Sequence, residues 1–244
     1  LNTAIGYLAL LQNLTGSGNT AIGYETLREN RNSDGNIAIG GGALATHRVG
    51  NLNIAIGEES LTVDTSGYNN IAVGGYSLKN NRKGNSNTVI GYNAMFNNSS
   101  GSNNEAFGCN ALESNTEGTN NTAIGSGSLC KNKTGYENVA IGYNAIAENT
   151  GDGNTALGSQ SLLYMKDGNF NTALGYGTIT SSMNFDSSTA IGSKAIVTAS
   201  NRVVIGHNSP NIIIGGYKTW SNLSDGRFKE NIKEDVPGMK FINL

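Results

Sequence analysis

The stretch Asn19-Thr20-Ala21-Ile22-Gly23-Tyr24 decides the fold, because close copies of it recur along the chain. Each copy is marked by a Gly that follows a large apolar residue, here named the repeat Gly. These glycines are residues 6, 23, 40, 57, 74, 91, 108, 125, 142, 158, 175 and 192, and ten of the eleven intervals between them are 17 residues. A fixed period of this length predicts a stack of similar structural units.

Each repeat has the same kinds of residue at fixed distances from its repeat Gly. The residue one before is large and apolar, the residue two before is Ala except at Val89, and the residue three before is Thr or another β-branched residue except at Glu105. Asn stands four before, until Ser188 replaces it in the last repeat. Leu, Met or Ile stands four after, and a second Asn column lies seven after, where His47 and Asp64 interrupt it.

These columns predict the shape of one coil. The Thr-Ala-Ile triplet favours a short strand, with Thr and Ile on one face and Ala on the other. The Gly then lets the backbone turn, the following Ala/Ser-Leu pair predicts a second, weaker strand, and stacked Asn side chains form hydrogen-bonded ladders. We therefore expect an all-β protein, a parallel β-roll or β-solenoid of about twelve 17-residue coils, roughly 55–60 Å long.

A coil of this size is thin. We expect it to bury about one Ile, one Leu and small residues, which leaves a second apolar face without cover. An uncovered apolar face predicts association with further copies of the chain.

Composition narrows the functional classes. The 244 residues include 34 Gly, and only 14% are charged, with a net charge of −2. No basic field for nucleic acid and no apolar run of the roughly 20 residues needed for a membrane helix are present, so neither nucleic-acid binding nor membrane insertion is expected. Cys109 and Cys130 occupy different positions in neighbouring repeats, which predicts free thiols, and no metal site or cofactor is expected.

The repeats resemble the head repeats of trimeric autotransporter adhesins and, equally, repeats of bacteriophage tail fibres. The resemblance covers residues 1–206, and Asn19-Thr20-Ala21-Ile22-Gly23-Tyr24 carries it. It implies a left-handed parallel β-roll in which three chains associate around a common axis, as an intertwined homotrimer. The 17-residue period is longer than that of the typical adhesin head coil.

The period fails after Gly192, where the next Ile-Gly pairs end at Gly206 and Gly215, after 14 and 9 residues. We expect the rod to taper there, with residues 207–223 as a neck or capping strand. Trp220 is expected to pack on the trimer axis or to lie exposed at the cap.

The segment Ser224-Asp225-Gly226-Arg227-Phe228-Lys229-Glu230-Asn231-Ile232 is similar to the start of the intramolecular chaperone domain of phage tail fibres and tailspikes. The resemblance implies a domain that drives trimer assembly and then cuts itself off, with Ser224 as nucleophile, Lys229 as its base and cleavage after Leu223. A neutral, desolvated Lys can activate a Ser hydroxyl. From the residues alone, Ser224 or Asp225 also fits as the N-cap of a short charged helix that ends near Pro237-Gly238. Residues 224–244 cover only the first part of such a domain, so we expect the chain to be part of a longer protein.

Other candidate sites are weaker. Tyr follows the repeat Gly in five repeats and could stack on sugars or simply cover a turn. The charged residues five to nine after the repeat Gly predict a solvated edge. No two carboxylates occupy the same position of neighbouring repeats, so the sequence shows no carboxylate pair of the kind that glycoside hydrolysis needs. The column of Thr residues three before the repeat Gly is interrupted too often to form a flat ice-binding face.

The sequence therefore predicts a structural or adhesive fibre segment rather than an enzyme, with self-cleavage between Leu223 and Ser224 as its one reaction. A virion tail fibre that attaches to a host-cell glycan or protein receptor is the first expectation. A trimeric adhesin on a bacterial cell surface is the alternative.

Overall fold

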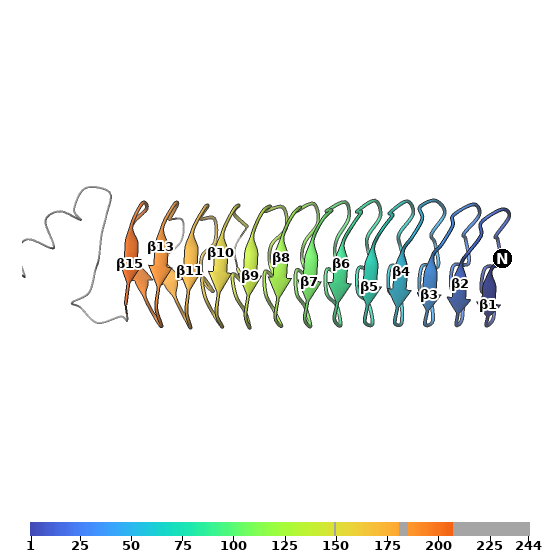
Figure 1. The fold of residues 1–244 in the computed structure, drawn as a ribbon, viewed down its shortest axis with the longest axis horizontal. Coiled ribbons are helices and arrows are strands. Elements are labelled where there is room, and N and C mark those ends of the chain that lie inside the picture. The colour runs from blue at the N-terminus through green and yellow to red at the C-terminus, as the bar shows by residue number, and fades with distance from the viewer. Residues whose placement is uncertain (149, 181–184, 207–244) are drawn as a thin grey trace, which may run out of the picture.

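A computed structural model describes residues 1–148, 150–180 and 185–206. In these ranges the chain is a straight rod of stacked coils (Figure 1), and the predicted all-β parallel solenoid of about twelve 17-residue turns is confirmed. No helix occurs in the described ranges. Thirteen strands form one parallel sheet: β1 (Thr3–Ile5), β2 (Thr20–Ile22), β3 (Ile37–Ile39), β4 (Ile54–Ile56), β5 (Ile71–Val73), β6 (Thr88–Ile90), β7 (Glu105–Phe107), β8 (Thr122–Ile124), β9 (Val139–Ile141), β10 (Thr155–Leu157), β11 (Thr172–Leu174), β13 (Thr189–Ile191) and β15 (Val203–Ile205).

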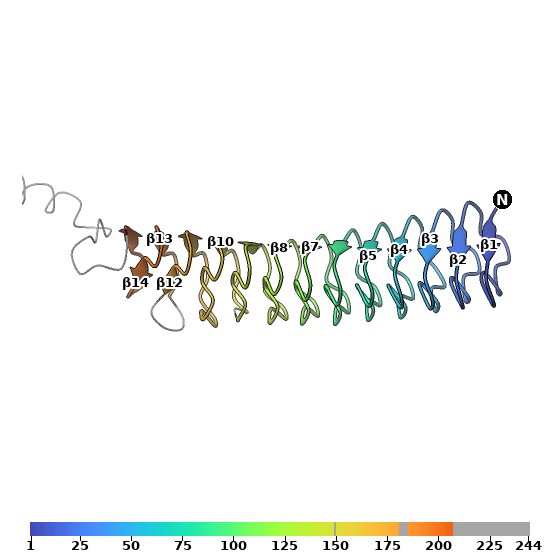
Figure 2. The same cartoon turned by 90° about the horizontal axis from the view of Figure 1, so that it is seen from below.

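Each strand pairs only with the same triplet of the coils before and after it. Ala21 lies opposite Ala38, and Ile22 lies opposite Ile39. The register survives the 16-residue repeat, where Val139 pairs with Thr155. It also survives a 14-residue coil, where Thr189 pairs with Val203, so the sheet runs one coil beyond the last regular repeat Gly. Figure 2 shows the sheet along one side of the rod and the closing turns along the other.

The interior differs from the prediction in one respect: Ala points inward, and Ile does not. From the second coil on, the Ala or Val at the centre of each strand is buried, as are the Leu residues four after the repeat Gly, which confirms Leu as a core residue; in the end coil Ala4 is exposed and Leu10 is partly buried. The Ile residues one before the Gly are half-buried or exposed, for example Ile90 at 42%. The reason is space, because the facing turn brings Leu into the coil and leaves room for a small side chain, which is Ala in most coils and Val89 in β6.

The predicted second strand is wrong for most coils. The segment after the repeat Gly is a chain of turns, in which the residues two and four after the Gly have left-handed backbone angles, such as Glu59 (φ 52°) and Leu61 (φ 51°). A left-handed residue cannot belong to an extended strand. Only near the C-terminal end does this side form a second sheet, from β12 (Ile179–Thr180) and β14 (Ile196–Val197).

The repeat Gly is required by contact between coils. At Gly91, φ is +147°, and a Cβ atom would lie 2.3 Å from the carbonyl oxygen of Gly108. Backbone therefore lies directly against backbone at this corner, which no other residue type permits.

The Asn column four before the repeat Gly forms a buried ladder, as predicted. The Asn53 N–H donates to Oδ1 of Asn36 at 2.9 Å, and Nδ2 of Asn53 donates to the Gly67 carbonyl oxygen at 2.9 Å. The same bonds recur from coil to coil along the rod. Each Asn thus satisfies the backbone of two coils, which is what a buried polar row needs.

The second Asn column, seven after the repeat Gly, is also buried and contains a His–Asp pair. Nδ1 of His47 lies 3.0 Å from Oδ2 of Asp64, and Nε2 lies 2.7 Å from the Gly50 carbonyl oxygen. Oδ1 of Asp64 accepts from the Gly67 N–H at 2.9 Å and from Nδ2 of Asn81 at 3.2 Å. The two interruptions seen in the sequence are therefore partners in adjacent coils.

A third ladder, on the surface, was not predicted. Where the residue six before the repeat Gly is Asp, Asn or Ser, its side chain accepts from the backbone of the preceding coil: Asp34 Oδ1 accepts from the Ser17 N–H at 2.7 Å, and Asp186 Oδ1 accepts from the Asn169 N–H at 2.8 Å. The column mixes Ser, Asp, Asn, Thr and Tyr, so its sequence carries no clear pattern.

Candidate functional site

The outward face of the thirteen-stranded sheet is the most extensive candidate site. It is built from the first and third residue of every strand, because alternate residues of a strand point to the same side and the Ala between them points inward. We name it the outward sheet face. Its third residues are all large and apolar, and several are well exposed: Ile5, Ile56, Ile90, Ile124, Leu157, Leu174 and Ile205.

The outward sheet face is nearly free of charge. Its first residues are Thr, Ile or Val in every strand except β7, where Glu105 is exposed. The Glu105 carboxylate accepts a hydrogen bond from Oγ1 of Thr122, in the next coil, at 3.1 Å. One carboxylate therefore interrupts an otherwise uncharged surface that follows the whole described rod.

The size of this face is set by strand geometry. Thirteen strands at about 4.8 Å spacing span roughly 58 Å, and two outward side chains give a width of about 10 Å. The resulting area of roughly 600 Å² is mixed, because Thr occupies the first position of seven strands, but in extent it matches the largest apolar patches on ordinary monomers. It approaches the about 800 Å² that each partner contributes to a standard protein interface.

The exposed Tyr residues after the repeat Gly do not form a continuous aromatic row. Tyr7 and Tyr24 stack with ring centroids 5.7 Å apart and an interplanar angle of 12°. Non-aromatic residues occupy the same position in the next three coils, before Tyr92. The position after the repeat Gly therefore does not present the evenly spaced aromatic rings that stacking along a sugar chain would need.

The predicted catalytic residues, Ser224 and Lys229, lie outside the described residues, together with the Leu223–Ser224 bond. The same holds for the neck or capping strand at 207–223, for Trp220 and for the helical segment within 224–244.

Within residues 1–148, 150–180 and 185–206, no group of three or more His, Cys, Asp or Glu side chains could hold a metal ion. No helix in those ranges is long and apolar enough to cross a membrane.

The two cysteines are free thiols in different environments. Cys109 is exposed, whereas Cys130 is partly covered and lies with Sγ 3.4 Å from the Ala147 carbonyl oxygen. Burial raises the pKa of the Cys130 thiol. A raised pKa lowers the fraction of thiolate, the reactive form, at neutral pH.

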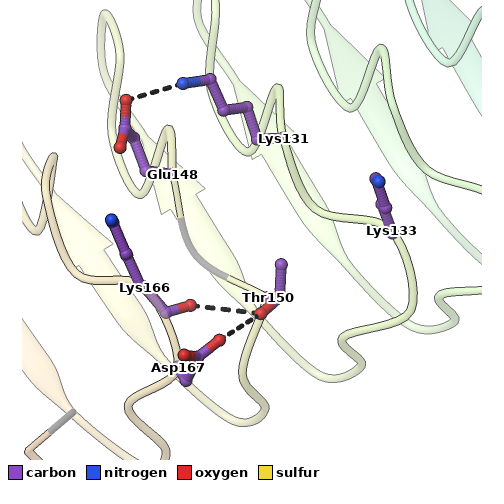
Figure 3. A pocket seen from close by; sticks show the side chains of 6 residues that line it. All are labelled: Lys131, Lys133, Glu148, Thr150, Lys166 and Asp167. Carbon is purple, nitrogen blue, oxygen red and sulfur yellow. Dashed lines mark hydrogen bonds and ion pairs between the residues drawn. The ribbon is translucent and has the colours of Figure 1, made fainter. Parts of the chain in front are cut away.

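A hollow on the charged edge of the rod is a second candidate site (Figure 3). It is lined by Lys131, Lys133, Glu148, Thr150, Lys166 and Asp167, from three successive coils. Nζ of Lys131 lies 2.7 Å from Oε1 of Glu148. This hydrogen bond lowers the pKa of Glu148 and raises that of Lys131, so both are charged at neutral pH.

Comparison with known proteins identifies no relative: no protein-family model matches the chain, and no curated protein sequence matches it. The fold is thus a parallel β-solenoid repeat, which is consistent with a structural or adhesive fibre.

Proposed function

We propose that the chain is the shaft of a fibrous attachment protein, in which three copies pack their outward sheet faces together around a common axis. The observation that carries the proposal is the uncovered, nearly uncharged sheet face of thirteen strands. Removing the exposed Ile and Leu side chains of this face from water would stabilise the assembly, and the Thr side chains beside them carry no charge. The resemblance of the repeats to fibre and adhesin heads supports three as the number of copies.

The stacked coils suit a role in reach and rigidity. Every strand is hydrogen-bonded to its neighbours, and two buried ladders tie the coils together, so bending would break many bonds at once. A rod of this kind places a host-binding surface away from the particle or cell that carries it.

We assign the fibre to a virion tail, where it would attach to a host-cell glycan or protein receptor. A trimeric adhesin on a bacterial cell surface shares the same shaft and is the alternative. The rest of the protein's architecture would separate the two: a virion-attachment domain would support the first, and an export signal with a membrane anchor would support the second.

Self-cleavage is the one reaction that we assign to the protein. The Oγ atom of Ser224 would attack the Leu223 carbonyl carbon while neutral Lys229 accepts the hydroxyl proton. The C–N bond between Leu223 and Ser224 then breaks, the α-amino group of Ser224 takes up the proton, and water hydrolyses the resulting ester to leave a new carboxyl group on Leu223. The test is full-length protein carrying Ser224→Ala or Lys229→Met, compared with wild type by mass spectrometry. Wild-type chains cut after Leu223 and intact variant chains are expected, and intact wild-type chains would refute the assignment.

Assembly is tested by light scattering on the full-length protein. The wild type is expected at three times the mass of its chain. Ile90→Lys/Ile124→Lys, which places two charges on the outward sheet face, is expected to be monomeric. The control, Asn97→Lys/Thr134→Lys, adds the same two charges at exposed positions on another edge and is expected to remain trimeric. A monomeric wild type, or a trimeric Ile90→Lys/Ile124→Lys variant, would contradict the proposal.

A further inference from the structure

The hollow on the charged edge keeps two lysines outside any ion pair in the described part of the chain. Glu148 is bound to Lys131, and Oδ1 of Asp167 accepts a hydrogen bond from Oγ1 of Thr150 at 2.7 Å. Figure 3 shows Lys133 and Lys166 on either side of Thr150. Glu148 is thus held in an ion pair, whereas Asp167 is held by a neutral hydroxyl group and adjoins Lys166 in the sequence, and the ammonium groups of Lys133 and Lys166 are exposed.

These two lysines belong to a longer row. Both stand eight residues after their repeat Gly, and we name this column the basic row. The same position holds exposed arginines in earlier coils and hydroxyl residues in most others: Arg31, Arg48, Thr65, Arg82, Ser99, Thr116, Lys133, Thr150 and Lys166. No Asp or Glu occupies the column between residues 14 and 166.

Most of the basic row is available to a ligand. Arg48 is bound to Glu29 at 3.0 Å, but no ion pair holds Arg31 or Arg82 in the described ranges. Because the coils are stacked in register, these cations lie along one line parallel to the rod axis. Lys133 and Lys166, two coils apart, are separated by about 9.6 Å along that line.

A line of cations separated by hydroxyl groups matches an extended polymer with repeated oxyanions. Arg and Lys bind carboxylate, sulfate or phosphate groups. The Thr hydroxyl groups between them donate to the next coil, but their oxygen atoms can still accept hydrogen bonds from sugar hydroxyls. Duplex nucleic acid is less well matched, because it needs a broad basic field and the chain has a net charge of −2. A single small anion would not need a row that extends over nine coils.

We infer that the basic row, with the hollow around Thr150 as its strongest point, binds a linear anionic polysaccharide along the rod. This inference rests on the attachment role proposed above and names the class of receptor. It does not depend on the outward sheet face, which is a different part of the coil.

The test measures binding of the full-length protein to heparin, polygalacturonate, neutral dextran and duplex DNA by biolayer interferometry. Heparin and polygalacturonate separate sulfate from carboxylate recognition. The expected result is binding to at least one of them at about 50 mM salt, weaker binding to DNA and none to dextran. No binding to either anionic polysaccharide, or tighter binding to DNA, would overturn the inference.

Two charge-matched variants locate the site. Lys133→Gln/Lys166→Gln is expected to lower the affinity about tenfold or more and to reduce the slope of log K against log salt by about two, one for each lost contact. The control, Lys194→Gln/Arg202→Gln, removes two exposed charges outside the row and is expected to change the affinity less than about twofold. Equal losses of affinity in both variants would show a general effect of charge and would overturn the assignment of the site to the basic row.

The molar mass of each sample separates this inference from the proposed assembly. A trimer that binds no anionic polysaccharide refutes the basic row as a receptor site and leaves the fibre proposal intact. A monomer whose binding is lost only in Lys133→Gln/Lys166→Gln supports the basic row and refutes the assembly.

Discussion

The His47–Asp64 pair allows a sharp test of how the buried ladder is held together. Both side chains are 0% exposed. Nε2 of His47 lies 2.7 Å from the Gly50 carbonyl oxygen, so it must carry a hydrogen and donate. One further proton is then shared between Nδ1 and Oδ2 of Asp64, which are 3.0 Å apart. Because both ring nitrogens of His47 are engaged in these contacts, His47 donates nothing to Asn30 in the preceding coil. The Oδ1 atom of Asn30 is therefore buried without a hydrogen-bond partner in the described part of the chain.

The two single substitutions are expected to differ widely. In His47→Asn, the Oδ1 atom of the new residue and the Asp64 carboxylate are two acceptors facing each other, and a buried charge loses its partner. That loss costs about 3–5 kcal/mol. In Asp64→Asn, the new amide donates to Nδ1 of neutral His47 and still accepts from Gly67 and Asn81, so the cost is about 1 kcal/mol or less.

The double variant, His47→Asn/Asp64→Asn, restores an uninterrupted Asn ladder and gives Asn30 a donor. It is expected to be as stable as the wild type or more stable by up to about 3 kcal/mol. The costs of the single variants would therefore not add, and the coupling energy between the two positions would be at least about 3 kcal/mol.

The assay is urea unfolding followed by circular dichroism, with native-state hydrogen exchange at the Gly67 amide as a local readout, since that amide donates to Asp64. The reasoning is refuted if His47→Asn costs less than about 1 kcal/mol, or if the double variant shows the summed cost of the two single variants.

Three further predictions follow from the coil geometry. Gly91→Ala is expected to destabilise the rod by roughly 2–5 kcal/mol, because its Cβ atom would meet the backbone of the next coil. Gly41→Ala, where a Cβ atom has open space, is expected to be neutral or stabilising by up to about 1 kcal/mol. Equal melting temperatures of the two variants would contradict this prediction. Iodoacetamide at pH 8 is expected to label exposed Cys109 well before Cys130, whose pKa is raised by burial, and equal labelling rates measured by mass spectrometry would be the contrary result. Glu105→Ile removes the one charge of the outward sheet face and is expected to raise the melting temperature of the assembled fibre; an unchanged or lower value would mean that this face is not buried.

The sequence was sufficient to predict the coil length, the strand positions and the Asn ladders, because each depends on identical residues stacked at a fixed period. It did not determine which strand face lies inside. Ala21 and Ile22 are both apolar, and alternation alone does not say which of them meets the turn across the coil.

The left-handed turns could not be predicted either. Leu61 has a φ of 51°, which costs a residue with a Cβ atom about 1 kcal/mol or more, and Gly or Asn would be expected there. Burial of the Leu side chain in the core outweighs that cost, so the local preference is overridden by packing. The residues of the basic row could be read from the sequence, but their partners could not. Only the structure shows that Glu148 pairs with Lys131 and that Asp167 accepts from Thr150, which leaves Lys133 and Lys166 without an ion pair in the described residues.

The central claim is that copies of the chain meet through the outward sheet face, and cysteine cross-linking in the full-length protein tests it most directly. With Cys109 and Cys130 replaced by Ser, Ile124→Cys is placed on the face, and Ser126→Cys is placed two residues later, beyond the repeat Gly. Under mild oxidation, the account predicts disulfide-linked chains for Ile124→Cys and single chains for Ser126→Cys on a non-reducing gel. Single chains for Ile124→Cys, or equal linkage in both variants, would contradict the account.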